Sequence, residues 1–331
     1  MKALVTGGAG FIGSNFVMRA LAADRGNEVS VLDSLTYAAD IRNLGGASGD
    51  KRYSFIKGDI RDPAAVDRAM RGCDAVVNFA AESHVDYSIT NPRLFYETNV
   101  LGTLTLLESA RRHDASFLQI STDEVYGDVQ EGESRESDPL VPSSPYSASK
   151  AAADNLAYAF FRTYGMDVKT TRTTNNYGPF QHIEKLIPKF VLLALSGKKL
   201  PIYGSGESVR EWIHVNDNCD AILGVLGKGR PGSAYNIGTG ERKSVMEVAR
   251  TILSALGKDA SMVSHEAARP GEDTRYALDS SRMRALGWAP KIGFKSGISD
   301  TIKWYADNRS WWEGKTKTHD LGSRHTKLHK P

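Results

Sequence analysis

Short apolar runs and amphipathic stretches alternate along the first half of the chain. Runs typical of strands lie at residues 2–6, 28–32, 53–57, 74–79, 115–121 and 167–171. Between several of them, apolar residues recur with helical spacing, at 11–24, 63–71 and 99–113. This alternation predicts an α/β fold, a Rossmann-like doubly wound parallel sheet with helices on both faces. Ligands of such sheets bind at the carboxyl ends of the strands.

The pattern loosens beyond Tyr177, where glycine and proline interrupt it repeatedly. Helical spacing is still visible at 183–196, 245–256 and 294–307. We therefore predict a Rossmann domain over 1–177, to which the chain returns around 208–242, and a smaller mixed α/β lobe made of 178–207 and 243–313. Residues 314–331 are basic and have no apolar periodicity, so they predict a solvated, mobile tail.

Composition narrows the class of protein. The 331 residues are 40% hydrophobic and 24% charged, as in an ordinary globular protein, and the formal net charge is only +3. Such a small charge gives no reason to expect a nucleic-acid partner. No apolar run has membrane length, and Cys73 and Cys219 lack metal-ligand or disulfide spacing. We therefore expect a cytoplasmic protein with neither a membrane partner nor a metal.

A glycine motif follows the first predicted strand. Gly7, Gly10 and Gly13 stand where that strand ends and the first helix begins. Glycines there allow a tight turn and a close approach of the backbone to a pyrophosphate, which the positive end of the helix attracts. A glycine-rich turn without a ligand is the alternative, and the strand before and helix after the motif disfavour it.

An acidic residue lies at the end of the second strand. Asp33 is twenty residues past Gly13, where it can accept hydrogen bonds from both ribose hydroxyls. Its charge would repel a 2′-phosphate and no Arg or Lys adjoins it, which favours NAD over NADP. After the third strand, Asp59 and Ile60 could border the adenine, although Asp59 could equally cap the following helix.

Two residues on a later predicted helix suggest alcohol oxidation. Tyr146 and Lys150 are four residues apart and therefore share one helix face. An ammonium beside a phenol lowers the phenol's pKa, which prepares Tyr146 to remove an alcohol proton. This spacing is common by chance, and its weight comes from the glycine motif upstream.

Several motifs together resemble the extended, nucleotide-sugar-modifying branch of the short-chain dehydrogenase/reductases. They lie at 6–13 (TGGAGFIG), 78–82 (NFAAE), 146–150 (YSASK), 175–179 (NNYGP), 209–212 (VREW), 235–238 (YNIG) and 269–271 (RPG). The resemblance therefore covers nearly the whole chain.

Within that branch, the segment after the fifth strand distinguishes the reactions. Here it reads STDEVYG at 121–127, and the adjacent Asp123 and Glu124 resemble the dTDP-glucose 4,6-dehydratase family. Epimerases have small residues at these two positions, and decarboxylases typically have Ser before the Glu. A solvated acidic pair is the alternative, which the apolar strand before it disfavours.

The resemblance implies a catalytic role for each of five residues. Tyr146, supported by Lys150, would take the proton from the sugar O4 while C4 passes a hydride to NAD. Glu124 would then remove the C5 proton, and Asp123, as a protonated carboxyl, would donate to the departing C6 hydroxyl. Thr122 would hydrogen-bond the O4 region. The two carboxyls need unlike environments to hold opposite protonation states.

The resemblance also implies binding residues. Those for the cofactor are Gly7, Gly10, Phe11, Ile12, Gly13, Asp33, Asp59, Ile60, Ala80, Ala81, Asn99, Tyr146 and Lys150. Those for the nucleotide-diphosphate sugar are Thr122, Asn175, Lys185, Leu186, Pro201, Tyr203, Arg210 and Arg269. Ordinary packing explains Leu186, Pro201 and Tyr203 nearly as well, whereas Lys185 and Arg210 suit a diphosphate by their charge.

Three positions depart from the family pattern. Glu272 stands where His is usual, Tyr87 replaces a common Arg, and 239–245 lacks a frequent Asn. All three lie outside the catalytic set and concern recognition of the nucleotide and sugar. The family also implies a homodimer formed through the helices at 99–113 and 146–164. A UDP-sugar 4-epimerase, a UDP-glucuronate decarboxylase and a non-catalytic NAD-binding regulator remain as alternatives.

Overall fold

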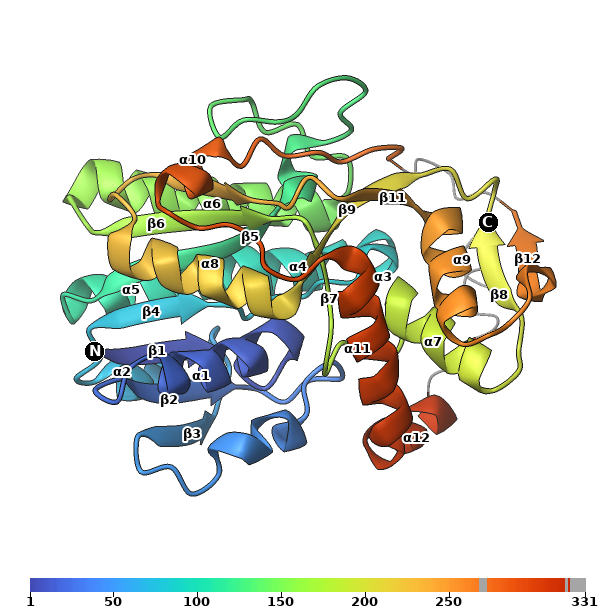
Figure 1. Cartoon of the computed structure of the whole chain (residues 1–331). Coiled ribbons are helices and arrows are strands. Elements are labelled where there is room, and N and C mark those ends of the chain that lie inside the picture. The colour runs from blue at the N-terminus through green and yellow to red at the C-terminus, as the bar shows by residue number, and fades with distance from the viewer. Residues whose placement is uncertain (268–272, 319–320, 322–331) are drawn as a thin grey trace.

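The structure is a computed structural model that describes residues 1–267, 273–318 and 321. It has a large domain around a central sheet and a smaller lobe beside it (Figure 1). Two residues named above lie outside the described residues: Glu272, where the sequence departs from the family pattern, and Arg269, a predicted substrate-binding residue. Among the described residues, no helix combines the length and apolarity that a membrane crossing requires.

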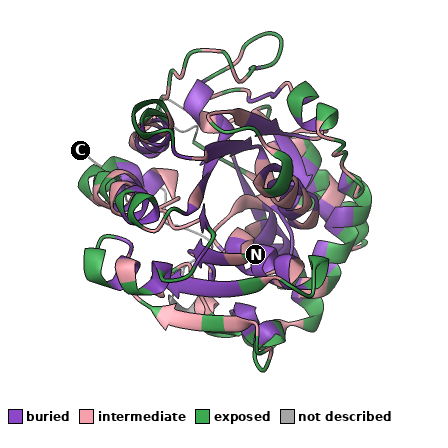
Figure 2. Cartoon of the chain, turned by 90° about the vertical axis from the view of Figure 1, so that its left-hand side faces the viewer, coloured by how far each residue is buried: buried purple, intermediate pink, exposed green. Residues whose placement is uncertain are grey.

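The central sheet has seven parallel strands in the order β10-β6-β5-β4-β1-β2-β3. Their bounds are β1 Lys2–Thr6, β2 Glu28–Asp33, β3 Tyr53–Lys57, β4 Ala75–Asn78, β5 Ser116–Thr122, β6 Val168–Thr173 and β10 Ala234–Ile237. The interior strands are buried along nearly their whole length (Figure 2), as expected when helices cover both faces. The predicted doubly wound sheet is confirmed, and its strand order reverses between β1 and β4, where such folds bind ligands.

Helices cover the two faces of this sheet separately. The helices α1 Phe11–Ala23 and α8 Val215–Lys228 contact each other and share one hydrophobic core with β1, β2 and β10. The other face carries α2 Pro63–Met70, α5 Thr103–Arg112 and α6 Pro145–Tyr164, with a second core (Figure 1). Between β4 and α5 lie two short helices that the pattern did not predict, α3 Val85–Thr90 and α4 Pro92–Tyr96, followed by a π-helical stretch, Glu97–Gly102.

Local chemistry sets the ends of α6, the helix that carries Tyr146 and Lys150. The Ser144 side chain accepts from the Ser147 N–H while Ser147 reaches back, which forms a capping box, and Pro145 occupies the first turn. At the other end Gly165 adopts a left-handed conformation (φ 67°) and stops the helix. The helix is therefore fixed in length and register by its own sequence.

The smaller lobe has a separate core rich in aromatic residues. It contains a three-stranded sheet, β11 Arg242–Ser244, β9 Val209–His214 and β7 Asn175–Tyr177, and a parallel pair, β8 Leu200–Tyr203 and β12 Val263–Glu266. Around them pack α7 Leu186–Leu195, α9 Val245–Ala255, α11 Phe294–Asp307 and α12 Arg309–Thr318. Trp212, Trp311 and Trp312 are buried in this core.

The chain moves between domain and lobe more often than the pattern predicts. In the structure, α8 and β10 belong to the large domain, whereas β9 belongs to the sheet of the lobe. A second return, not foreseen, is made by α10 Ser281–Ala285, whose Met283 is buried in the first core beside β10. Within the predicted tail, α12 continues to Thr318 and Lys315 Nζ lies 2.9 Å from Asp40. The rest of that tail, except residue 321, lies outside the described residues.

Candidate active site

The loop from β1 to α1 requires its glycines for steric reasons. A Cβ on Gly13 would lie 2.3 Å from the carbonyl oxygen of Gly7, and one on Gly7 would lie 2.6 Å from the nitrogen of Ala80. Gly7 also has a positive φ of 67°, and Gly10 begins α1 without a side-chain cap. The loop therefore presents backbone N–H groups and a helix N-terminus to whatever lies in front of it.

Asp33 does more in the structure than the spacing indicated. One carboxylate oxygen accepts a hydrogen bond from Ala9 N at 2.9 Å and the other from Leu35 N at 2.8 Å. Burial raises the pKa of Asp33, and these two backbone donors oppose that rise. Asp33 thus fastens the glycine loop to the end of β2, and its carboxylate oxygens, each with further acceptor capacity, face the pocket.

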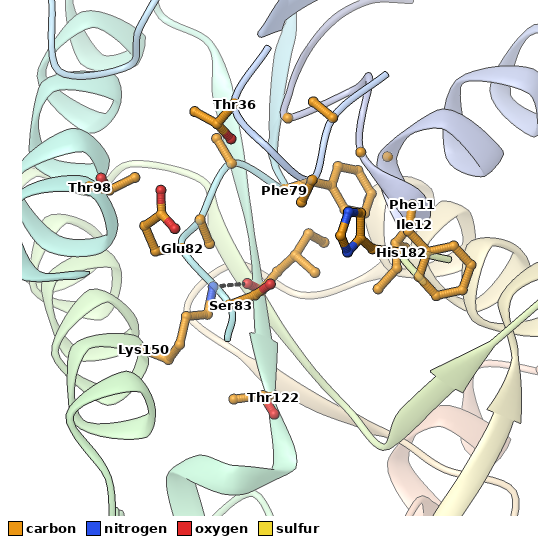
Figure 3. A pocket seen from close by; sticks show the side chains of 18 of the residues that line it. Phe11, Ile12, Thr36, Phe79, Glu82, Ser83, Thr98, Thr122, Lys150 and His182 are labelled. Atoms are coloured by element: carbon orange, nitrogen blue, oxygen red, sulfur yellow. Dashed lines mark hydrogen bonds between the residues drawn. The ribbon is translucent and has the colours of Figure 1, made fainter. Parts of the chain in front are cut away.

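A pocket of about 330 Å³ runs along the carboxyl ends of the central strands (Figure 3). It brings most of the predicted residues together. Those that line it are Gly7, Gly10, Phe11, Ile12, Gly13, Asp33, Asp59, Ile60, Ala80, Ala81, Thr122, Asp123, Glu124, Tyr146, Lys150, Asn175 and Lys185. Asp59 accepts from the backbone and guanidinium of Arg61, whereas Asp62 caps α2, so the capping alternative for Asp59 is not what the structure shows.

Asn99 lies behind the pocket wall. From the π-helical stretch, its side chain accepts from Glu82 N at 2.8 Å and donates to Glu82 O at 3.1 Å and to Ser149 Oγ at 2.9 Å. Its neighbour Thr98 lines the pocket instead (Figure 3). Asn99 therefore positions the segment after β4 from within the π-helical stretch.

Tyr146 and Lys150 share one face of α6, as predicted, and both are buried. Lys150 Nζ donates to the carbonyl oxygen of Ile120 at 2.6 Å, and burial lowers the pKa of Lys150 to about 8. Burial raises the pKa of Tyr146, and the charges of Glu124 and Asp123 raise it further, while a hydrogen bond with Thr122 lowers it. The lowered Tyr146 pKa that the spacing suggested is thus not found in the chain alone.

A buried ion pair lies behind Lys150. One turn further along α6, Asp154 Oδ2 is 3.0 Å from Arg172 Nε on β6, and both side chains are almost fully buried. Arg172 also donates to the Tyr126 hydroxyl at 2.8 Å. Among the charges acting on Lys150, that of Asp154 raises its pKa against the effect of burial. Asp154 therefore helps to keep Lys150 an ammonium, a role that the sequence analysis missed.

The two adjacent carboxyls have unlike surroundings. Both follow β5 in a short 3-10 turn, Asp123–Tyr126, where Thr122 accepts from Glu124 N and donates to Asp123 Oδ1 at 3.1 Å. Burial raises the pKa of Asp123 well above its usual value, and the charges of Glu124 and Glu211 add to this. Burial also raises the pKa of Glu124, but the charges of Lys185 and Arg210 lower it. The pKa values of both carboxyls are thus raised, that of Asp123 well above its usual value, and Lys185 acts on Glu124 alone.

The predicted substrate residues divide into two groups. Asn175 and Lys185 line the pocket, and Lys185 Nζ donates to Ser83 O at 3.0 Å. Arg210 does not line it, although its charge reaches Glu124; its guanidinium donates to the carbonyls of Val209 and Asp273 and lies over the Tyr276 ring. Of the others, Leu186 packs partly buried against the lobe core, Pro201 is buried in β8, and Tyr203 ends that strand.

Some pocket residues carried no recognisable signal in the sequence. His182 and Glu184, between β7 and α7, line the pocket, as do Glu82 and Ser83 after β4. Ser83, His182 and Glu184 belong to no motif, and only their position after strands could have indicated them, whereas Glu82 ends the motif at 78–82 that carries part of the family resemblance.

Comparisons with known proteins agree with this geometry. The family model described as GDP-mannose 4,6 dehydratase matches residues 4–301. A dTDP-glucose 4,6-dehydratase from Streptomyces niveus is 48% identical over 319 residues, which are 95% of each chain. The crystal structure of DesIV, a dTDP-glucose 4,6-dehydratase from Streptomyces venezuelae solved with NAD bound, has 51% identity and a TM-score of 0.93, covering 95% of this chain and 99% of its own.

A solved epimerase, which belongs to a related reaction class, is less similar to this chain. The UDP-glucose 4-epimerase from Thermus thermophilus, solved with NAD, has 35% identity and a TM-score of 0.86 over 93% of this chain and 100% of its own. The whole-length match to the family model and the relatives near 50% identity settle the assignment. The chain belongs to the GDP-mannose 4,6 dehydratase family.

Proposed function

We propose that this protein is an NAD-dependent enzyme that converts dTDP-glucose into dTDP-4-keto-6-deoxyglucose and water. The observation that carries the proposal is the adjacent pair Asp123 and Glu124, which line one pocket with Tyr146 and differ in the charges that act on them. Relatives near 50% identity that are named for this reaction support it.

The residues present fit a bound dinucleotide. The glycine loop can make its tight turn against Ala80 and the start of α1 only because Gly7 and Gly13 lack side chains, and the N-terminus of α1 can then face a pyrophosphate. Asp33 at the end of β2 is placed to accept from the adenosine ribose, and no 2′-phosphate would fit its charge. Bound NAD would supply a hydride acceptor for C4 of the sugar and, once reduced, a hydride donor for C6.

The chain's own groups handle the protons. Tyr146, hydrogen-bonded to Thr122, takes the proton from O4 as C4 becomes a ketone, and Lys150 supports the phenolate. The ketone makes the C5 proton acidic, and Glu124 removes it. Asp123 protonates the departing C6 hydroxyl, which leaves as water. Glu124 then returns a proton to C5, which completes a reaction with no net oxidation.

Substrate recognition is proposed for the remaining candidates. We assign binding of the substrate's diphosphate to Lys185 and Arg210. Both are cations, and both lie near enough to Glu124 for their charges to lower its pKa. Asn175 lines the same pocket as Lys185. Leu186, Pro201, Tyr203 and Arg269 stay predictions from the family resemblance.

A panel assay tests the reaction. Purified protein with NAD is incubated with dTDP-, UDP- and GDP-sugars, and products are identified by mass spectrometry. We expect dTDP-glucose to lose water without accumulation of NADH. Formation of isomers alone would indicate an epimerase, carbon dioxide from UDP-glucuronate a decarboxylase, and no product from any sugar a non-catalytic NAD-binding regulator; each rejects the dehydratase.

Two conservative variants test the roles of the carboxyls. Asp123→Asn and Glu124→Gln should each slow dehydration by about 10²- to 10⁴-fold, because proton transfer in the elimination is lost. Oxidation at C4 should persist, so NADH absorbance should accumulate on the enzyme. Asp259→Asn, which changes an exposed cap in the lobe, is the matched control. Unchanged product formation in both variants would reject the assigned roles.

We also propose a cytoplasmic homodimer. Large apolar side chains about half exposed lie around α6, at Ile89, Tyr96, Leu101, Tyr158 and Tyr164. This supports pairing through α5 and α6, as the family implies, since such side chains gain most from burial. The cysteines Cys73 and Cys219 are free and buried, which suits a reducing compartment. A protein that stays monomeric in analytical ultracentrifugation would contradict the dimer.

A further inference from the structure

Four side chains gather around the carboxylate of Glu184 at one end of the pocket. Three chain segments supply them: the loop after β2, the segment that runs from β4 into α3, and the segment between β7 and α7. We call this set the Glu184 cluster; it consists of Tyr37, His84, Tyr87, His182 and Glu184. Neither the glycine motif nor the proposed catalytic steps account for it.

The members of the Glu184 cluster contact one another. His182 Nδ1 lies 3.5 Å from Glu184 Oε1, His84 Nε2 lies 3.7 Å from Glu184 Oε2, and the Tyr37 phenol hydrogen-bonds Glu184. The His84 ring stacks on Tyr87 at 4.3 Å, and Tyr37 meets the rings of Tyr87 and His182 edge-on at 5.6 Å each. Three segments far apart in sequence are thereby tied together.

Charge strengthens these ties. Burial by itself raises the pKa of Glu184, but the hydrogen bond with His182 and the charges of His84, His182 and Lys185 lower it to about 2. Glu184 is therefore an anion at neutral pH. Hydrogen bonds to an ionised group are roughly twice as strong as neutral ones, so loss of this one charge should loosen the whole cluster.

The backbone next to the cluster is strained at two points. Leu35 (φ 56°) and Phe180 (φ 69°) adopt left-handed conformations, and each lies two residues before a member of the cluster, Tyr37 and His182. Such conformations are unfavourable for a non-glycine residue, and they concentrate at ligand clamps. A hydrogen bond from Tyr305 Oη to the carbonyl of Gln181, at 2.5 Å, holds the second segment in place.

The cluster borders the dinucleotide pocket directly. His182 and Glu184 line it together with Phe11 and Ile12 of the first helix turn, and Figure 3 shows the imidazole of His182 on the side of Phe11 and Ile12. The reaction proposed above takes a hydride from C4 and returns the same two electrons to C6. The reduced cofactor must therefore stay bound through the elimination. If it left early, an unsaturated keto sugar and one free NADH would remain.

We propose that the Glu184 cluster is a clasp that retains the reduced dinucleotide between the two hydride transfers. The proposal rests on the proposed function and adds positioning residues to it. Tyr87, one of the departures from the family pattern, belongs to the clasp: its ring contacts Tyr37 and His84, and the His84 and His182 rings lie 3.7 and 3.5 Å from the Glu184 carboxylate.

The dissociation rate of NADH tests the proposed clasp directly. Holoenzyme loaded with NADH is diluted into excess NAD, and the loss of bound-NADH fluorescence gives the dissociation rate. Glu184→Gln keeps the shape of the side chain and removes its charge, so release should be about tenfold faster. During turnover of dTDP-glucose, free NADH should appear in the medium. Glu247→Gln is the matched control, because a Gln keeps the capping box of α9 in the same lobe.

Each outcome decides between the alternatives. A Glu184→Gln release rate within about twofold of the unaltered protein, well below the effect of losing a charged hydrogen bond, would overturn the clasp. If circular dichroism shows that this variant does not fold, Tyr37→Phe replaces it, since it removes only one hydroxyl from an exposed side chain; unchanged release then overturns the proposal. Failure of the proposed function is a different result, namely no dehydrated sugar from the unaltered protein.

Discussion

The cofactor side and the substrate side of the pocket are built in different ways. On the cofactor side, the glycine loop and Asp33 follow strands of one continuous sheet, and backbone geometry determines what fits there. On the substrate side, Lys185 and Arg210 come from the smaller lobe, whose separate core places them through long-range packing. On the cofactor side, substitutions that add a side chain to the glycine loop should not be tolerated. On the substrate side, substitutions that keep the positive charge should be tolerated.

The catalytic groups lie where the two sides meet and depend on both. Asp154 and Arg172, buried between α6 and β6, act on Lys150 from the large domain. Lys185 and Arg210 act on Glu124 from the lobe. The charge on Lys150 and the charge on Glu124 are therefore influenced from different parts of the fold.

The largest effect should come from Gly13→Ala. Its Cβ would meet the carbonyl of Gly7 at 2.3 Å, so the loop must move. We expect NAD affinity to fall about 100-fold and stability by about 2 kcal/mol, measured by fluorescence titration and thermal unfolding. Gly45→Ala is the control, since a Cβ there meets nothing within 4 Å. Near-normal NAD binding by Gly13→Ala would refute the steric account of the cofactor side.

An intermediate effect should follow from Asp154→Asn. Burial lowers the pKa of Lys150 to about 8, although the charge of Asp154 raises it. The ammonium of Lys150 is therefore present below pH 8 and lost above it. Without Asp154 the pKa falls further, and the alkaline limb of the kcat profile should move down by about one pH unit. We expect kcat at about pH 9 and above to drop about tenfold, while KM changes little.

The control for this variant is a second buried carboxylate. Asp217 accepts from Lys291 N and Ile292 N, away from Lys150, and Asp217→Asn should leave the pH profile unchanged. If Asp154→Asn lowers activity equally at every pH, its role is structural and the assigned effect on Lys150 is wrong.

The smallest effect should come from Arg210→Lys on the substrate side. The variant keeps the charge but loses the planar fork that donates to Asp273 O at 2.9 Å. We expect KM for dTDP-glucose to rise about fivefold with kcat nearly constant, measured by steady-state kinetics. Arg282→Lys, which alters an exposed arginine near Glu136, is the control. A fall in kcat alone would show that Arg210 serves catalysis instead of binding.

Much of the large domain could be predicted because its signals are local. The alternation of strands and helices, the ends of α6 at Pro145 and Gly165, and the position of Asp33 all depend on residues close together in the chain. The short helices α3 and α4 were missed because a single turn of helix has too few positions to show a period. The second return, through α10, was missed because only contacts with β10 define it.

By itself, the sequence determined the parallel sheet, the glycine loop, the shared face of Tyr146 and Lys150, and the adjacency of Asp123 and Glu124. Periodicity and spacing along one chain suffice for these. Only the tertiary structure decided that Asn99 lies behind the pocket wall, that Tyr146 has a raised pKa in the chain alone, and that Glu184 joins three segments. The physical reason is that burial and electrostatic surroundings depend on residues distant in sequence, which no local pattern records.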